Sequence, residues 1–182
     1  KIRETYIEEN GILRPAFISE DKMSLARPLV TGTNAELLEH ATVAWRYFEA
    51  NTDPETGLAN SANAYPSTTM WDTASYLLGI VSAEVLGVIS NDEADLRLEK
   101  ALNSLLLMEL SDGKLPNKAY HTATLEMVDY NNKPAANGIG WSAIDIARIL
   151  TAFRIIEQHF PKSSVKITEI LSTWDLTAMS EE

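Results

Sequence analysis

The sequence predicts an all-α protein built from repeated helix pairs, the arrangement of an α/α-toroid. Helical segments with one apolar face alternate along the chain with helical segments that are apolar almost all round. Two of the apolar segments match each other at a constant offset, with Asp72 and Asp145 at equivalent positions. A two-layer ring requires this alternation, because a single helix pair cannot cover its own apolar face.

The first 33 residues differ from the rest of the chain. Their apolar residues are scattered between Pro15, Pro28 and Gly32 without a sustained helical period, which predicts an extended N-terminal wrap with room for one short helix. Residues 34–182 are expected to form the toroid portion. Its first helix begins at Asn34, a good N-cap, and has one apolar face, formed by Leu37, Leu38, Ala41, Trp45 and Phe48.

A second helix is expected over about residues 69–86, after a turn-rich loop broken by Pro54 and Gly57. This helix has almost no polar face, so we expect it to be buried on every side. Ser90 and Glu93 have capping-box spacing and predict the start of a third helix. That helix again has one apolar face, formed by Leu98, Ala101, Leu102 and Leu105.

A long loop from Ser111 to Gly140 leads to a second mostly apolar helix over about residues 142–159. The last helix has one apolar face, formed by Ile167, Ile170, Leu171 and Trp174. Together these segments make about two and a half helix pairs. Because the last helix lacks an inner partner, we expect its apolar stripe to be exposed. We therefore predict that the chain is one portion of a larger toroid, or else a homodimer across this C-terminal edge.

Both apolar helices begin with a tryptophan and an aspartate. In a ring of helix pairs the inner helices are parallel, so their N-termini meet at one face, where free N–H groups and the positive dipole end attract anions. Asp72 and Asp145 are therefore the catalytic candidates, and Trp71 and Trp141 are predicted to bind substrate beside them. A carboxylate kept ionised by a helix N-terminus suits a general base or nucleophile, so a general acid is expected elsewhere.

The two aspartates also fit a purely structural role. Thr69 with Asp72, and Ser142 with Asp145, have the hydroxyl-x-x-acid spacing of a capping box. In that alternative each aspartate does no more than cap its own helix.

Three further candidates for substrate binding lie on the loops that lead into the apolar helices: Tyr65, Tyr120 and His121. Aromatic rings stack well on the apolar faces of sugar rings. Ordinary packing within the loops is the alternative for each of them.

Composition and motifs exclude several classes of function. The formal net charge of −11, from 26 acidic and 15 basic residues, disfavours nucleic acid and anionic membranes as partners. The longest apolar run is too short to cross a bilayer, so no membrane span is expected. The chain has no cysteine, and its three histidines lack the spacing of metal ligands. It also has no nucleotide-binding or serine-hydrolase motif. No metal or cofactor is therefore expected. Residues 51–57 match a calcium loop poorly, because Gly57 stands at the wrong position.

Four motifs occur together in the chain: TGL at residues 56–58, TMWDTA at 69–74, KLPNK at 114–118 and GWSAID at 140–145. In this order, over about residues 35–176, they resemble the bacterial family catalogued as domain of unknown function 3131. That family is similar to α/α-toroid glycoside hydrolases of the glucoamylase type, and many members are cell-envelope proteins with signal sequences. The resemblance implies a periplasmic or exported protein acting on glycan, and it supplies no established catalytic pair.

Two functions of different classes remain open. The first is a glycan-processing domain of the glycoside-hydrolase kind, or a glycan-binding domain, in a bacterial cell-envelope protein. The duplicated tryptophan and aspartate positions favour it. The second is a non-catalytic helical-repeat module that binds a protein partner, which the absence of any motif that names a reaction favours.

Overall fold

The computed structural model describes residues 6–9, 12–15 and 34–179. It divides into two units, Lys1–Ala35 and Glu36–Glu182. In the first unit, strands β1 (Tyr6–Glu9) and β2 (Ile12–Pro15) pair as an antiparallel hairpin, which the sequence analysis does not predict. The remainder of the wrap predicted for residues 1–33, with its short helix, lies outside the described residues.

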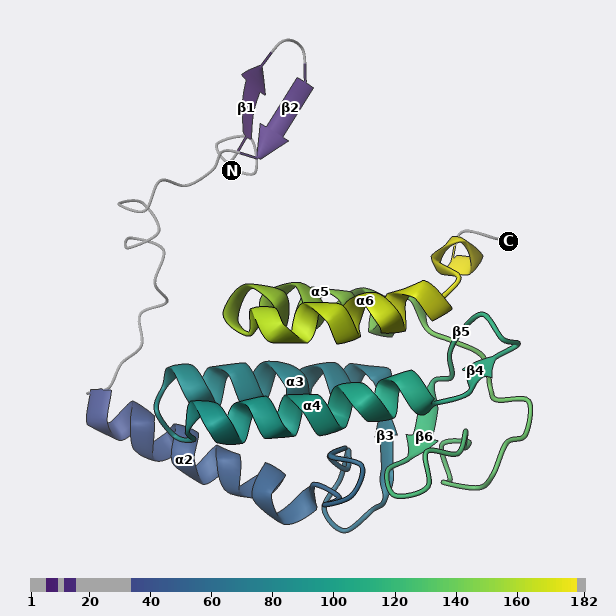
Figure 1. Cartoon of the computed structure of the whole chain (residues 1–182), viewed down its shortest axis with the longest axis horizontal. Helices are drawn as coiled ribbons and strands as arrows, with labels where there is room; N and C mark the ends of the chain where they lie inside the picture. Colours follow the sequence, from purple (N-terminus) through teal and green to yellow (C-terminus); the bar gives the residue numbers. More distant parts are fainter. Residues whose placement is uncertain (1–5, 10–11, 16–33, 180–182) are drawn as a thin grey trace. The chain divides into compact units, whose positions relative to one another are not determined.

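The α-helices of the second unit alternate in direction along the chain (Figure 1). They are α2 (Asn34–Asn51), α3 (Met70–Val85), α4 (Asn91–Leu107), α5 (Ala143–His159) and α6 (Ser164–Thr173), with 3-10 turns η3 (Pro161–Ser163) and η4 (Leu176–Met179). α3 lies along α5 in an inner layer, and α4 lies along α6 in an outer layer. The predicted all-α fold of alternating inner and outer helices is confirmed.

Two short antiparallel ribbons fix the loops at the end of the unit where α3 begins (Figure 1). β3 (Ser67–Thr69) pairs with β6 (Ala119–His121), and β4 (Leu110–Ser111) pairs with β5 (Leu115–Pro116). α3 starts at the residue that follows β3. Backbone hydrogen bonds therefore tie the loop between α4 and α5 to the N-terminus of α3.

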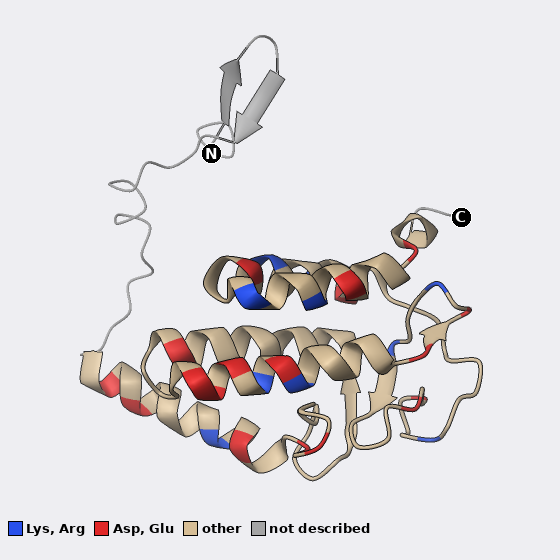
Figure 2. Cartoon of the chain, viewed as in Figure 1, with Lys and Arg blue, Asp and Glu red and all other residues tan. Residues whose placement is uncertain are grey.

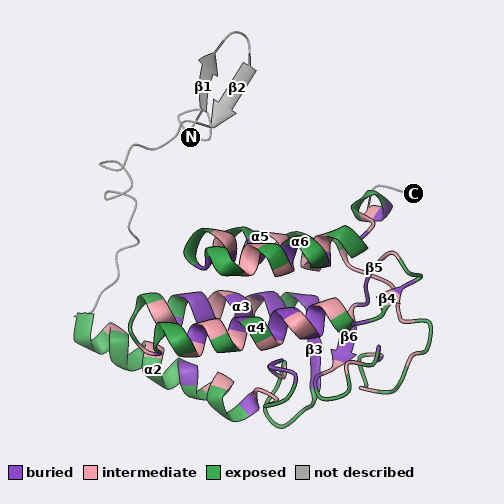
Figure 3. Cartoon of the chain, viewed as in Figure 1, coloured by how far each residue is buried: buried purple, intermediate pink, exposed green. Residues whose placement is uncertain are grey.

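The core lies between the helix layers (Figure 3). Its fully buried side chains include Leu77 and Ile80 of α3, Leu98 of α4 and Ile149 of α5. Complete burial of one such side chain stabilises the fold by about 1.5–3 kcal/mol relative to its exposure. The apolar periodicity of the sequence is thus realised as contacts between the two layers.

The expectation that the second helix is buried on every side is wrong. Trp71 at the start of α3 is 41% exposed and Val85 at its end is 61% exposed. Ile144, at the equivalent position to Trp71 on α5, is 71% exposed. The reason is that the outer helices cover only one side of the inner layer, so the other side of α3 and α5 faces solvent.

The expectation that the last helix exposes its apolar stripe is also wrong. Ile167 and Ile170 of α6 are fully buried, and Trp174 is 6% exposed, with its ring 5.8 Å from that of Phe153. α6 packs on α4 and α5 of the same chain, and Ala178 in the following 3-10 turn is buried as well. An exposed stripe on this helix therefore no longer supports a homodimer or a larger toroid, and both stay predictions.

Gly57 and Gly113 provide a matched test of the loop packing. Both have positive φ, 69° and 65°, but a Cβ at Gly57 would lie 2.5 Å from Lys100 Cβ, whereas a Cβ at Gly113 would meet nothing within 4 Å. Each change to alanine has the backbone cost of about 1–2 kcal/mol. We expect Gly57→Ala to lose about 1–3 kcal/mol more, because of the overlap with α4. Urea unfolding measures both, and equal losses would contradict the packing described.

Candidate functional site

The hydroxyl residues cap both inner helices. Asp72 N–H donates to Thr69 Oγ1 at 3.1 Å, and Asp145 N–H donates to Ser142 Oγ at 3.4 Å. The Thr69 hydroxyl in turn donates to Asp72 Oδ2 at 2.7 Å. The predicted capping spacing is therefore real, but the caps are made by Thr69 and Ser142 rather than by the aspartates.

The two aspartates are both half-buried, and they differ in what surrounds them. Asp72 lies close enough to Tyr47 of α2 that its charge, after burial of the phenol, raises the Tyr47 pKa. The Asp145 carboxylate accepts no hydrogen bond from any other described residue. Among residues 34–179, the Asp72 carboxylate is thus hydrogen-bonded within the cap of α3, whereas the Asp145 carboxylate is not.

Arg148 joins the two inner helices. Its guanidinium lies 4.1 Å from the centroid of the Trp71 ring, and its Nη2 donates to Ser75 Oγ at 3.1 Å. Ser75 and Arg148 are 73 residues apart, which is the constant offset at which the two apolar helices match, so they occupy equivalent positions. This bond joins equivalent positions of α3 and α5, and Asp72 and Asp145 each lie one turn before them in their own helix. Arg148 was not predicted, because nothing in the sequence distinguishes it from Arg154 on the same helix.

Cation–π contact with Arg148 fixes the indole of Trp71 while leaving it 41% exposed. Trp141 differs, because it is only partly exposed and packs against the core. The structure therefore presents Trp71 as an open aromatic surface, and Trp141 as a side chain shared between core and surface.

Asn117, which is fully buried, organises the loop that leads to Trp141. Its Nδ2 donates to the carbonyls of Ala119 and Val128, at 2.7 and 3.2 Å, and its Oδ1 accepts from Ile139 N–H at 2.6 Å. A Cβ on Gly138 would lie 2.8 Å from that oxygen. These bonds give partners to Val128 O and Ile139 N–H, while Ala119 O also accepts from Val128 N–H at 3.1 Å.

Tyr120 is fully buried, and its hydroxyl donates to Glu109 O and accepts from Asn117 N–H, both at 2.7 Å. Burial raises its pKa far above the usual value. The side chain offers no surface to a ligand, so its predicted part in substrate binding is not supported. His121 is partly exposed, and its Nδ1 accepts from the N–H groups of Ala123 and Thr124.

Tyr65 is 38% exposed, and its hydroxyl donates to the backbone oxygen of Tyr130 at 3.3 Å. Tyr130 itself is 67% exposed. The sequence analysis did not single out Tyr130, because its surroundings in the long loop carry no repeat or motif. The structure brings these two tyrosines together across 65 residues of chain.

A depression of about 510 Å³ lies beside this long loop. Its lining is apolar apart from one threonine and two carboxylates, and consists of Leu107, Glu109, Thr124, Leu125, Glu126, Met127, Pro134, Ala135 and Ala136. Glu126 accepts a hydrogen bond from the Thr124 hydroxyl at 2.9 Å. The hollow therefore combines hydrogen-bond acceptors with apolar side chains.

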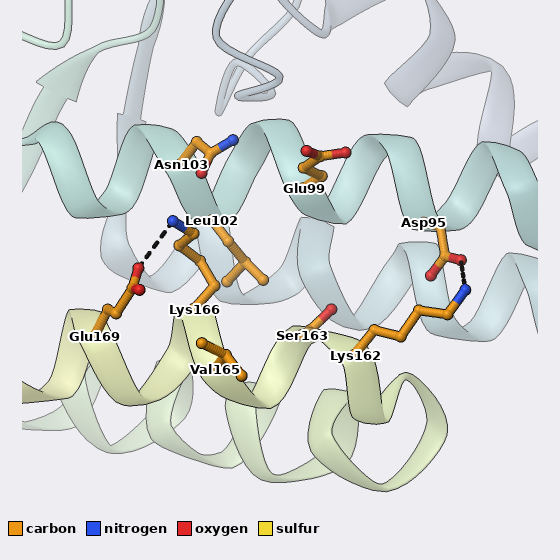
Figure 4. Close-up of a pocket in the computed structure, with 9 residues that line it drawn as sticks. All are labelled: Asp95, Glu99, Leu102, Asn103, Lys162, Ser163, Val165, Lys166 and Glu169. Carbon is orange, nitrogen blue, oxygen red and sulfur yellow. Dashed lines mark ion pairs between the residues drawn. The ribbon is translucent and has the colours of Figure 1, made fainter.

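A second groove, of about 480 Å³, lies between the outer helices α4 and α6 (Figure 4). Lys162 faces Asp95 at 3.6 Å and Lys166 faces Glu169 at 2.8 Å. Acidic residues also follow the outer helices α2 and α4 (Figure 2). Exposed pairs of this kind contribute about 0–1 kcal/mol each, so the groove is a charged, solvated surface.

Within residues 6–9, 12–15 and 34–179, no group of three or more acidic or histidine side chains is placed to hold a metal ion. The same residues contain no helix with the length and apolarity that a membrane span requires.

Two layers of alternating helices, with the loops gathered where the inner helices begin, define the fold class of this chain, which is that of the α/α-toroids. A beta-1,2-glucanase from Parabacteroides distasonis is similar to it with a TM-score of 0.62 and 20% identity, over 79% of this chain and 21% of that one. An endo-beta-1,2-glucanase from Chitinophaga pinensis, solved with sophorotriose and glucose, is similar with a TM-score of 0.60 and 13% identity. The match covers 79% of this chain and 37% of that one. A structure from Bacteroides uniformis, provisionally described as a glucoamylase, has a TM-score of 0.62 and 18% identity, over 79% of this chain and 36% of that one. The chain thus spans between about a fifth and two fifths of these structures.

The family model described as "Protein of unknown function (DUF3131)" matches residues 39–182. The chain belongs to this family, as its four motifs predict. Comparison with curated proteins gives no match. At these identities, the likeness to the glucanases shows a common fold and nothing finer.

The buried and exposed tyrosines allow a direct test of their roles. Tyr120→Phe leaves Asn117 N–H and Glu109 C=O without a partner, so we expect a loss of about 1–3 kcal/mol in the free energy of unfolding. Tyr65→Phe removes one exposed hydrogen bond and should change that free energy by less than about 0.5 kcal/mol. Urea unfolding distinguishes them, and equal effects would mean that Tyr120 does not support the loop.

Proposed function

We propose that this chain is a glycan-binding portion of an α/α-toroid, with its ligand lying across the N-terminal ends of α3 and α5. The observation that carries the proposal is the exposed indole of Trp71, held by the guanidinium of Arg148. An exposed aromatic surface on an inner helix adds little to the core, whereas indole faces stack well on sugar rings. The related folds of two beta-1,2-glucanases support a glycan as the ligand class.

Hydrolysis is the second part of the proposal, with Asp72 and Asp145 as its candidates. The Ser75 to Arg148 bond between α3 and α5 lies one turn from both aspartates and supports this pairing. The separation of the two carboxyl groups decides the outcome: about 6.5–9.5 Å suits inversion of the anomeric centre, and about 5–5.5 Å suits retention.

The location in the cell envelope is also part of the proposal. It rests on the family resemblance, and fractionation of cells that make the whole protein tests it. Recovery in the cytoplasm would reject it.

Binding is tested with Trp71→Ala on a glycan array that includes β-1,2-glucan. We expect at least a tenfold loss of affinity, or about 1.4 kcal/mol, because the stacking surface is removed. Leu96→Ala is the matched control, since Leu96 is also exposed but lies on the outer helix α4. Unchanged binding by Trp71→Ala, or equal losses in both variants, would reject this surface.

Hydrolysis is tested with Asp72→Asn and Asp145→Asn, by reducing-sugar release and by NMR of the product anomer. Each change keeps the side-chain shape, so we expect binding to persist while hydrolysis falls about 10²-fold or more. A wild-type chain that binds glycan but releases no sugar would leave the binding function and reject the catalytic part.

A protein partner is the second candidate function. The observation that favours it is the charged groove between α4 and α6, where Glu99 lies between the two ion pairs (Figure 4). Charge reversal by Glu99→Lys would weaken the binding of such a partner and leave Trp71 unchanged. If no glycan on the array binds, and if binding of a protein partner is lost in Glu99→Lys, this function is favoured over the first.

A further inference from the structure

Tyr130 is the most exposed large aromatic side chain among residues 34–179, at 67%. It lies in a tight turn in which Asp129 Oδ1 accepts from Lys133 N–H at 2.9 Å and from Asn131 N–H at 2.8 Å. Asp129 N–H also donates to Lys133 O at 2.9 Å. These bonds, chiefly the one from Lys133 N–H, lower the Asp129 pKa. The turn is therefore ordered while the ring at its tip stays in solvent.

The loop that carries Tyr65 is fixed independently. Ala64 N–H donates to Asn51 Oδ1 at 2.9 Å, and Tyr65 N–H donates to Ala62 O at 3.1 Å. The Tyr65 hydroxyl then reaches Tyr130 O. The Tyr65 side chain thus contacts the backbone of the turn that carries the exposed Tyr130 ring, and we call these two residues the tyrosine pair.

The tyrosine pair and Trp71 are separated by β3. Tyr65 precedes this strand by two residues, and Trp71 follows it by two. Three extended residues alone span about 10 Å. A ligand that contacts both aromatic surfaces would have to bridge this segment of backbone.

The turn that carries Tyr130 also borders a hollow. Residues 124–127 and 134–136, on either side of the turn, line the depression of about 510 Å³. The carboxylates of Glu109 and Glu126 there can accept hydrogen bonds from sugar hydroxyls. A chain of sugars leaving Trp71 would find stacking and hydrogen-bonding groups along this loop.

We propose that the tyrosine pair is a second sugar-stacking subsite, and that the ligand is consequently an oligosaccharide or polysaccharide rather than a mono- or disaccharide. This inference rests on the proposed glycan-binding function. It assigns Tyr130 a binding role that depends on ligand length, whereas Trp71 contacts ligands of every length.

The test is calorimetric titration of the full chain with a length series, from disaccharide to octasaccharide, of the glycan that the array identifies. For the wild type we expect affinity to rise at least tenfold along the series. Tyr130→Ala should abolish most of that rise and leave disaccharide affinity unchanged. Tyr130→Phe keeps the ring and should behave as the wild type, while Trp71→Ala should weaken binding at all lengths.

The outcomes separate the two proposals. If Trp71→Ala weakens binding but Tyr130→Ala matches the wild type at every length, the second subsite is wrong and the glycan-binding function stands. If Tyr130→Ala weakens disaccharide and octasaccharide equally, the length dependence is wrong. If no glycan on the array binds, both proposals are overturned. Because Tyr130 is exposed, its replacement should leave unfolding unchanged, which the same samples verify.

Discussion

The loop between α4 and α5 depends on the buried amide of Asn117. A chain segment of this length cannot be covered by other residues unless its backbone polar groups find partners, and Asn117 supplies three of them. Gly138 makes the close approach possible, because any larger residue would collide with the Asn117 oxygen. The part of the proposed surface that this loop contributes is thus held by a polar contact inside the protein, whereas Trp71 is held by Arg148.

The sequence was sufficient for the helices, because each outer helix keeps one apolar face and each inner helix is apolar over most of its surface. It was not sufficient to predict which elements cover those apolar faces. The sequence predicts that Val85 is buried, although it is exposed. An apolar residue on the open side of an inner helix has the same neighbours in the sequence as a buried one. Trp174 reads as an uncovered edge although it packs on Phe153, since only the folded chain shows that α6 lies over α4 and α5.

The candidate site was predicted in part, for similar reasons. The helix ends could be located from the spacing of Thr69 and Asp72, because capping is a local interaction. Arg148 and Tyr130 were missed, because their significance depends on partners far along the chain, Trp71 and Tyr65. Tyr120 was placed in the site by its aromatic character, but its hydroxyl is used to hold the loop.

The ordered state of the loops has a consequence for the kinetics of association. Two tight turns, a buried amide and a short ribbon already hold the backbone around Tyr65 and Tyr130 in place, so little backbone entropy remains to be lost when a ligand arrives. Encounter with such a preorganised surface requires no slow rearrangement. Differences in affinity between ligands should then appear in how long each stays bound, rather than in how fast it arrives.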